Sequence, residues 1–334
     1  MNIFTDINWA GAYDQFKIIF TSLLIVALYI ALAYAGILYI LANKIRYGFG
    51  VVPKKTMRNY TLTKSSTLSV LGNAERWQRV ADESDEKHDS FLLYYLDRTQ
   101  TEGFIIGRLY PTPNSKGVYV YVHGLGDDLT RGLEYLEVAR TYGYDLLVYD
   151  QPNHGKSWNN GRGNCYGYNN CRALVEVMRY VHQRFPEKKT IIHGASMGGA
   201  TVTFAMADNE NKKKNWYANV EKVFLENPML DLKRLLFSLV LDMGAHFIKT
   251  NHILVMYGWL TKANPYYTAL SVVGGINKQV YLFHSTEDTI IPFYLALQAK
   301  AQNSRIKLTI YEHGEHSMLF QQDPKPFLAA LDPV

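Results

Sequence analysis

The residue best suited to chemistry in this chain is a serine placed between two glycines. Residues 194–198 read Gly-Ala-Ser-Met-Gly, directly after an apolar run and before a helical pattern. Gly194 and Gly198 suit a sharp strand-to-helix turn, because the strained backbone there leaves no room for neighbouring side chains. Such a turn lifts the Ser196 hydroxyl clear of a sheet and towards a helix N-terminus, which favours a developing negative charge. We therefore expect Ser196 to act as a nucleophile.

A second loop at a strand end is suited to stabilising an oxyanion. An oxyanion hole requires two backbone N–H donors aimed at one point. The N–H groups of Leu125 and Met197 are well placed if the strands that end just before them neighbour each other through one intervening strand. His123 and Gly124 are expected to support this loop, and a catalytic base is the alternative role for His123.

The composition excludes several function classes. Of the 334 residues, 48% are hydrophobic and 19% are charged, so the chain can bury a sizeable core and is not mainly disordered. The net charge of +5 is mild, and the one dense basic run, 212–214, is typical of a solvated turn, so no nucleic-acid partner is expected. Two cysteines rule out a disulfide-built scaffold and offer no four-ligand zinc pattern.

The elements that must position these residues form an alternating pattern. The predicted strands are 91–96, 103–109, 118–122, 146–149, 190–193, 222–225, 279–283 and 307–311. The predicted helices between and after them are 129–142, 170–185, 197–208, 292–302 and 326–331. The first strands are hairpin-like, and the later order of strand, helix and strand predicts a mostly parallel eight-stranded sheet with helices on both faces.

One interval breaks this alternation. More than fifty residues separate the predicted strands 222–225 and 279–283, and they include the apolar runs 232–241 and 252–260. Loops of that length are usually functional or carry structure of their own. We expect a helical cap, inserted at about 229–270, over the strand ends. The alternative is that these helices simply pad the core.

Residues 18–42 form an uncharged apolar run of 25 residues, bracketed by Lys17 and Lys44. At about 1.5 Å per residue, such a helix is roughly 37 Å long and can cross a hydrocarbon core of about 30 Å. A cleaved signal peptide would be shorter and begin with basic residues, and a buried core helix would show a polar face. The expected division is a tail (1–17), a transmembrane helix (18–42), a basic and polar tether (43–88) and a folded domain (89–334).

The flanking charges favour one face of the membrane. Six basic residues follow the apolar run before the first acid at Glu75, whereas Lys17 is the only one ahead of it. The positive-inside rule then places the long C-terminal part on the cytoplasmic side of a bacterial plasma membrane. The alternative is an exported domain, in which Cys165 and Cys171 could pair. Two unpaired thiols are the other interpretation of these cysteines.

Together these features resemble the α/β-hydrolase superfamily over about residues 91–331, and most of all the membrane-tethered bacterial serine hydrolases of that fold. The matching features, in the family's order, are the His123-Gly124 loop, the stretch from Tyr149-Asp150 to His154-Gly155-Lys156-Ser157, the 194–198 turn, and Asp288 and His316 after the last two strands. The chain departs from the pattern at Gln151-Pro152-Asn153, where an Arg-Gly pair is more usual.

The resemblance implies a catalytic triad in the order serine, acid, histidine. Asp288 lies four residues before a proline that opens a helix, and His316 follows the final strand. The imidazole would remove the serine proton, and the carboxylate would fix its tautomer and stabilise its charged form. The alternatives are Glu287 and Asp231 as the acid and His313 as the base.

The site and the resemblance imply acyl transfer without a metal or an organic cofactor. We expect a membrane-anchored serine hydrolase that cleaves carboxylic esters or thioesters. An apolar cap beside a bilayer favours lipophilic or lipid-like acyl substrates. The first alternative is a serine peptidase or aminopeptidase of the same fold, because the serine turn cannot distinguish an ester from an amide. The second alternative is a non-catalytic binding protein that retains the fold.

Overall fold

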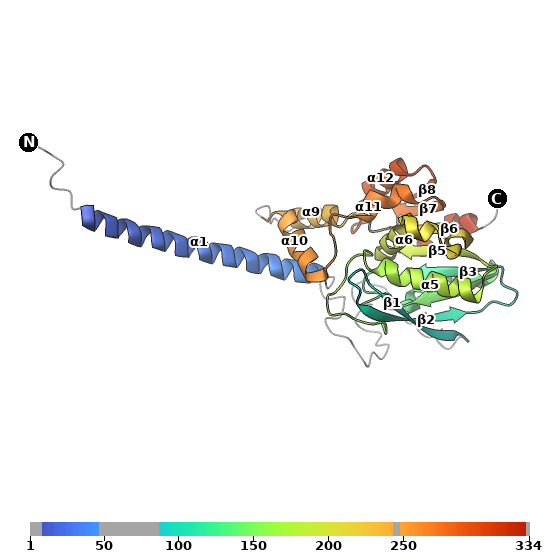
Figure 1. Ribbon diagram of the computed structural model, residues 1–334. Helices are drawn as coiled ribbons and strands as arrows, with labels where there is room; N and C mark the ends of the chain where they lie inside the picture. Colours follow the sequence, from blue (N-terminus) through green and yellow to red (C-terminus); the bar gives the residue numbers. More distant parts are fainter. Residues whose placement is uncertain (1–8, 47–86, 243–247, 332–334) are drawn as a thin grey trace, which may run out of the picture.

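The computed structural model describes residues 9–46, 87–242 and 248–331, and its centre is an eight-stranded sheet (Figure 1). The strands lie in the order β1-β2-β4-β3-β5-β6-β7-β8. The pairs β1–β2 and β2–β4 are antiparallel, and all later pairs are parallel. The bounds are β1 (Asp89–Leu96), β2 (Glu102–Tyr110), β3 (Gly117–Val122), β4 (Tyr144–Tyr149), β5 (Lys189–Ala195), β6 (Val220–Glu226), β7 (Gln279–Ser285) and β8 (Ile306–Tyr311). All eight predicted strands are therefore confirmed.

The central strands are buried on both faces. Every residue of β3 is buried, with Val118, Val120 and Val122 in one hydrophobic core and Tyr119 and Tyr121 in the other. Side chains alternate between the two faces of a strand, so a strand that is apolar at every position needs helices above and below it. This pattern explains why the sequence reads as continuous apolar runs rather than as alternating ones.

Helices cover the sheet on both sides. The valine face packs against α5 (Asn170–Arg184), α6 (Met197–Ala207) and α12 (Tyr294–Gln302), and the short helices α7 (Asn209–Lys212) and α8 (Asn215–Asn219) link α6 to β6. The tyrosine face packs against η3 (Leu129–Tyr135), α4 (Leu136–Thr141), α13 (Leu319–Gln322) and α14 (Lys325–Leu331). The single helix predicted over 129–142 is therefore a 3₁₀ segment followed by a short α-helix.

The 3₁₀ segment η3 contains a glycine that lies very close to the sheet. A Cβ atom on Gly132 would lie 2.4 Å from Cγ1 of Val148 and 2.8 Å from Cδ1 of Tyr121. Glycine and threonine are poor helix formers, and both occur in this segment. The close approach and the weak helix propensity together explain why the first half of the predicted helix 129–142 is not α-helical.

The strands that lead to the Leu125 loop and to Ser196 are direct neighbours. β3 and β5 pair in parallel from Gly117 and Lys189 to Val122 and Gly194. The expectation of one intervening strand was wrong, because β4 crosses over to pair with the other edge of β3. The two loops therefore lie side by side at the carboxyl edge of the sheet.

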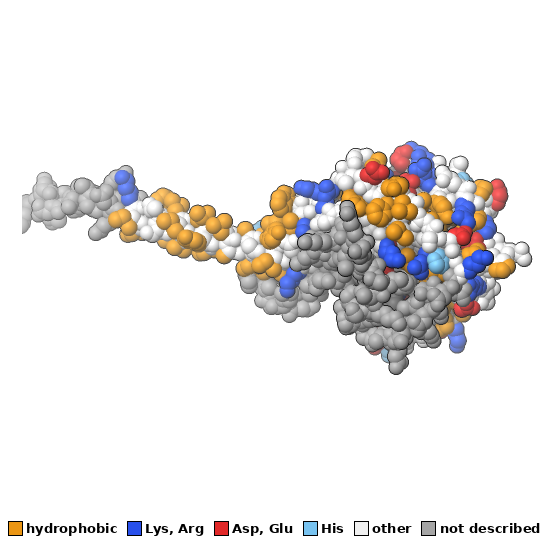
Figure 2. Space-filling view, turned by 90° about the horizontal axis from the view of Figure 1, so that it is seen from below, with side chains coloured by type: hydrophobic (Ala, Val, Ile, Leu, Met, Phe, Trp, Pro, Cys, Tyr) orange, Lys and Arg blue, Asp and Glu red, His pale blue; other side chains and the backbone are white. Residues whose placement is uncertain are grey.

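The helix α1 (Trp9–Arg46) projects from the domain as a long rod (Figure 1) and is longer at both ends than the predicted run 18–42. Its part Lys17–Arg46 is long and apolar enough to cross a membrane, and an 18-residue window within it has a mean hydropathy of 2.5. Figure 2 shows hydrophobic side chains along this rod and basic ones near both of its ends. The first four residues of the predicted tether, 43–46, continue α1, and positions 47–86 lie outside the described residues.

The predicted cap contains two long helices, α9 (Leu232–Asp242) and α10 (Thr250–Thr261), followed by α11 (Ala269–Val272) and the 3₁₀ turn η4 (Val273–Gly275). Leu236, Ile253 and Leu254 are buried in the core on the valine face of the sheet. Leu38, Ala42 and Ile45 of α1 belong to the same core. The inner faces of the cap helices therefore do contribute to the core, and the end of α1 is packed into it with them.

Candidate active site

Ser196 occupies the turn between β5 and α6 in a strained backbone conformation. Its φ and ψ are 53° and −117°, a region that residues with side chains rarely adopt. A Cβ atom on Gly194 would lie 2.5 Å from the Gly198 carbonyl oxygen, and one on Gly198 would lie 2.0 Å from that of Val122. Only glycine fits at either position, so the spacing follows from the close approach of α6 to the sheet.

The structure brings Ser196, His316 and Asp288 together in a hydrogen-bonded chain. Ser196 Oγ lies 2.7 Å from His316 Nε2, and His316 Nδ1 lies 2.7 Å from Asp288 Oδ2. With its proton on Nδ1, the imidazole donates to the carboxylate and accepts from the hydroxyl. The three residues follow β5, β7 and β8, so they meet at the carboxyl edge of the parallel sheet. The Asp288 side chain is fully shielded, whereas that of His316 is 11% exposed.

The Asp288 carboxylate is buried but well supported. Its Oδ1 accepts from the backbone N–H groups of Ile290 at 2.8 Å and Ile291 at 2.9 Å. Burial opposes ionisation, but the hydrogen bonds from His316, Ile291 and Ile290 outweigh it and hold the pKa of Asp288 below its usual value. The group is therefore a carboxylate at neutral pH and can act only as an acceptor.

Asn227 joins the aspartate loop to the histidine loop, and the sequence analysis did not single it out. Its Nδ2 donates to Asp288 Oδ2 at 2.7 Å, and its Oδ1 accepts from the Ser317 N–H at 3.2 Å. Its backbone φ is 41°, which asparagine tolerates better than most residues. The available signal was a polar residue directly after the apolar strand β6, at the carboxyl edge where the other site residues lie.

The rival residues lie elsewhere. Glu287 Oε1 and His313 Nδ1 lie 3.0 Å apart, and the two side chains are 57% and 72% exposed. Asp231 lies just before α9 and pairs with Arg234, with 3.3 Å between Oδ2 and Nε. Neither alternative acid thus has a hydrogen bond to His316, and the alternative base has none to Ser196.

The two predicted oxyanion donors belong to segments that meet at the serine. A Cβ atom on Gly124 would lie 3.3 Å from Cβ of Ser196, so the loop after β3 touches the serine turn. Leu125 is the next residue of that loop, and Met197 is the first residue of α6. The N–H groups of a first helical turn have no acceptor within the helix. That of Met197 can therefore be directed at a bound ligand.

His123 lies behind this loop and supports it. Its side chain is buried, with Nδ1 2.7 Å from the Gly124 carbonyl oxygen and Nε2 accepting from the Gln151 N–H at 2.9 Å. Burial and the neighbouring His154 lower the pKa of His123 to about 3, so the ring is neutral. Gln151 also donates to the His123 carbonyl at 2.5 Å and accepts from Asn170 at 3.1 Å. The departure from the usual Arg-Gly pair is thus accommodated by hydrogen bonds.

A buried ionic cluster holds the loop between β8 and α13, which carries the histidine. Glu226 accepts from the Leu319 N–H at 2.9 Å, and the Arg131 guanidinium donates to the Ser317 carbonyl. Both side chains are almost fully buried. Burial would raise the pKa of Glu226, but contacts with His193 and Arg131 outweigh it and lower the pKa. These two residues gave no motif in the sequence, and only the fold places them under the loop.

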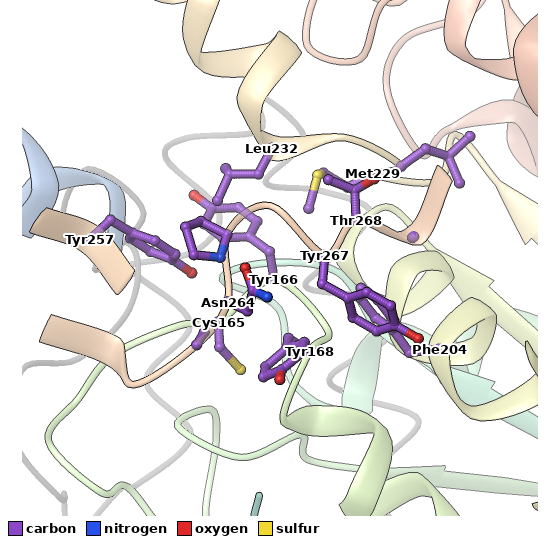
Figure 3. A pocket seen from close by; sticks show the side chains of 14 residues that line it. Cys165, Tyr166, Tyr168, Phe204, Met229, Leu232, Tyr257, Asn264, Tyr267 and Thr268 are labelled. Atoms are coloured by element: carbon purple, nitrogen blue, oxygen red, sulfur yellow. The ribbon is translucent and has the colours of Figure 1, made fainter. Parts of the chain in front are cut away.

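Two hollows border the site. An open cleft beside His316 is lined by polar and apolar residues of the two loops that carry the acid and the base, among them Thr289, Ile290, Glu315 and Met318. A smaller apolar pocket lies between the cap and α6. Figure 3 shows Tyr267 against Phe204 on one side of this pocket and Tyr257 on the other, with Leu232 and Tyr168 between them. Met229 lines this pocket, and its N–H donates to the Ser196 carbonyl at 2.9 Å. The pocket is therefore adjacent to the backbone of the serine turn.

The cysteines are not paired. Cys165 and Cys171 are both free and buried, so the pairing considered for an exported domain is absent. Burial raises the pKa of Cys165 to about 11 and also raises that of Cys171. Among residues 9–46, 87–242 and 248–331, no group of three or more His, Cys, Asp or Glu side chains could hold a metal ion.

Comparison with known proteins places this geometry in a family context. The sequence model of the family "Serine aminopeptidase, S33" matches residues 113–265. A Bacillus subtilis (strain 168) protein, uncharacterized protein YqkD, is 24% identical over 264 residues, which are 73% of this chain and 81% of that protein.

Solved structures support the same fold. An esterase of Pyrococcus furiosus, Pf2001, superimposes with a TM-score of 0.55 at 14% identity, covering 84% of this chain and 95% of that one. A putative hydrolase from Agrobacterium vitis S4 gives a TM-score of 0.54 at 15% identity, covering 74% of this chain and 98% of that one. At this identity the likeness shows the fold, which is the α/β-hydrolase fold that the sequence resemblance indicated.

Proposed function

Because the chain is a hydrolase of the α/β-hydrolase superfamily, we propose that it is a membrane-anchored serine hydrolase that cleaves carboxylic esters or thioesters. The observation that carries this proposal is the hydrogen-bonded chain from Ser196 Oγ through His316 to Asp288, with 2.7 Å at each step. A hydroxyl, an imidazole and a shielded carboxylate in this order are the parts that nucleophilic acyl transfer requires.

In the proposed mechanism, the Ser196 oxygen attacks the substrate carbonyl while its proton passes to Nε2 of His316. Asp288 stabilises the resulting imidazolium through Nδ1. The imidazolium then gives the proton to the departing alcohol or thiol, which leaves an acyl group on Ser196. Water enters, loses its proton to the same nitrogen and releases the acid, so the serine is restored.

The negative charge that develops on the carbonyl oxygen would be held by the N–H groups of Leu125 and Met197. Both belong to segments that touch Ser196, and α6 adds the positive end of its dipole. One such donor is typically worth about 3 kcal/mol of transition-state stabilisation. A side-chain substitution does not remove a backbone N–H donor. The hydrogen bonds of His123 and Gln151 therefore contribute to the mechanism by supporting the loop that carries the Leu125 donor.

The apolar surface around the small pocket in Figure 3 favours an acyl substrate with a hydrophobic group. Its lining is mostly aromatic and aliphatic, and it lies beside the serine turn. The esterase of Pyrococcus furiosus has the same fold and points to esters. The match to the S33 serine aminopeptidase model is the specific observation that favours the alternative, a peptidase that cleaves an amide at the same Ser196.

The experiment that separates these activities uses the full chain in mild detergent with two substrate panels. One panel contains p-nitrophenyl esters of increasing acyl length, and the other contains aminoacyl anilides. We expect turnover of esters, with a preference for longer chains, and a loss on the order of 10⁴-fold or more in Ser196→Ala. Ser304→Ala, which changes an exposed loop serine, is the matched control. Turnover of anilides alone would favour the peptidase, and equal activity in Ser196→Ala would overturn both.

The anchoring part of the proposal is carried by α1. Its part Lys17–Arg46 is 30 residues long, and most of its side chains are exposed. Extraction of membranes with alkaline carbonate should leave the full chain in the pellet, and its release into the supernatant would contradict a spanning helix. The basic residues that follow the apolar run favour a cytoplasmic domain, which a reporter fused to the C-terminus would test.

A further inference from the structure

The apolar part of α1 is longer than the hydrocarbon core of a bilayer requires. At 1.5 Å per residue, the 30 residues of Lys17–Arg46 extend about 45 Å, whereas the hydrocarbon core is about 30 Å thick. If Lys17 marks one edge of that core, the other edge falls about 20 residues later, near residue 37. The last turns of α1 then cross the headgroup layer.

These last turns are built into the domain. Leu38, Ala42 and Ile45 are buried, in contrast to the exposed side chains earlier in α1. The Tyr166 hydroxyl donates to the Ile45 carbonyl at 3.1 Å, and a Cβ atom on Gly163 would lie 2.6 Å from the carbonyl oxygen of the last helical residue. The end of α1 therefore packs directly against the described part of the domain.

The cap helix α10 has extensive contact with the end of α1. It packs along the end of α1, and Nδ1 of His252 in its first turn lies 3.0 Å from the hydroxyl of Tyr34. Tyr34 precedes the estimated edge of the hydrocarbon core by about three residues, or about 5 Å. The first turn of α10 therefore lies just inside the edge of the hydrocarbon core. Because Tyr257 donates to the carbonyl of Asn164, whose N–H bonds to Arg46, the later turns of α10 extend from there into the headgroup layer.

One face of α10 is exposed and has the composition of an interfacial helix. His252, Val255 and Trp259 follow one another at spacings of three and four residues, so they share one side of the helix, and Lys262 caps its C-terminal end. Val255 is 62% exposed and Trp259 is 64% exposed. The Lys262 ammonium lies 5.5 Å from the centre of the Trp259 ring. Tryptophan and lysine are the residues that favour the membrane–water interface.

We propose that this α10 stripe (His252, Val255, Trp259 and Lys262) contacts the lipid headgroups and holds the catalytic domain against the bilayer. The proposal rests on the proposed anchoring by α1. The occupant of this surface is lipid, because the stripe continues the surface of a spanning helix from the edge of the hydrocarbon core into the headgroup layer. The positive charges of Lys249 and Lys262 favour anionic lipids. A domain fixed in this way would take its substrates from the membrane surface.

Site-directed spin labelling of the full chain tests this arrangement. The chain is reconstituted into vesicles of phosphatidylcholine and phosphatidylglycerol, with a nitroxide at Val255→Cys or Trp259→Cys. Leu28→Cys, in the middle of α1, is the lipid reference, and Leu297→Cys, on the exposed side of α12, is the aqueous reference. Collision rates with oxygen, which enriches in lipid, and with a water-soluble nickel chelate are measured. The unaltered chain, with its two buried cysteines, gives the labelling background.

We expect the ratio of oxygen to nickel collisions at 255 and 259 to lie above the ratio at 297 and below the ratio at 28. Ratios at 255 and 259 equal to that at 297, with a lipid-like value at 28, would overturn the docking surface and leave the anchor intact. An aqueous value at 28 would overturn the anchor and the docking surface together. Shielding from both reagents with dipolar broadening would identify a second copy of the chain as the occupant and refute the lipid contact.

Discussion

Replacing Asn227 by glycine should slow the reaction of Ser196 without removing any of the three triad residues. The side chain of Asn227 donates to the same Asp288 oxygen that faces His316, and it accepts from the N–H of Ser317. Glycine accepts the φ of 41° without strain, so the backbone is preserved and only the side-chain contacts are lost.

The size of the effect follows from the bond that is removed. A hydrogen bond to a charged group contributes about 1.5–3 kcal/mol, and each 1.4 kcal/mol or so in the barrier changes a rate about tenfold. If the whole contribution is expressed in the transition state, the rate falls roughly 10- to 150-fold. Asp288 keeps the N–H groups of Ile290 and Ile291, so we expect the lower part of that range.

The assay is the second-order rate of serine phosphonylation by a fluorophosphonate probe, because it needs no knowledge of the natural substrate. Asn114→Gly is the matched control, since Asn114 also has a positive φ, of 54°, but lies in an exposed turn between β2 and β3. A rate in Asn227→Gly equal to that of Asn114→Gly, at equal thermal stability, would refute the positioning role. A rate more than a thousandfold lower would indicate that the whole loop has collapsed.

Three further outcomes are expected. Glu226→Gln should lower the free energy of unfolding by about 1–3 kcal/mol, because it removes a buried charge that holds the Leu319 N–H and faces Arg131; an unchanged melting temperature would argue against the cluster. Cys165 and Cys171 should not react with a maleimide until the chain unfolds, because both thiols are buried and have raised pKa values; fast labelling of the native protein would contradict their burial. Deleting residues 1–46 should expose the core beneath the cap and cause aggregation, whereas a deletion that keeps the last turns of α1 should not; equal solubility of the two products would show that this packing is dispensable.

The sheet could be predicted from the sequence because its information is local. Each strand is a short apolar run between turn residues, and the glycines around Ser196 report a close approach that no other residue allows. The order of Asp288 and His316 after the last strands came from the resemblance rather than from physical periodicity. The structure places these residues at hydrogen-bond distance, and their catalytic roles are still to be tested.

The remaining features depend on contacts between distant segments. Asn227 and Ser317 are 90 residues apart in the chain, and Arg131 and Ser317 are 186 apart. The adjacency of β3 and β5 depends on where β4 crosses over, which the spacing of apolar runs does not specify. The apolar run of α1 is predictable from hydropathy, but the burial of Leu38 and Ile45 depends on how α10 and the loop 163–166 pack against the end of α1.

The central claim is that the hydroxyl of Ser196 is activated by His316, and peptide mapping after reaction with a fluorophosphonate tests it most directly. The folded full chain should gain a single phosphonyl group on the peptide that contains Ser196. The gain should disappear in Ser196→Ala and slow strongly in His316→Ala, while both variants keep their melting temperature. A folded chain that gains no adduct, or that carries the adduct on another residue, would contradict the account.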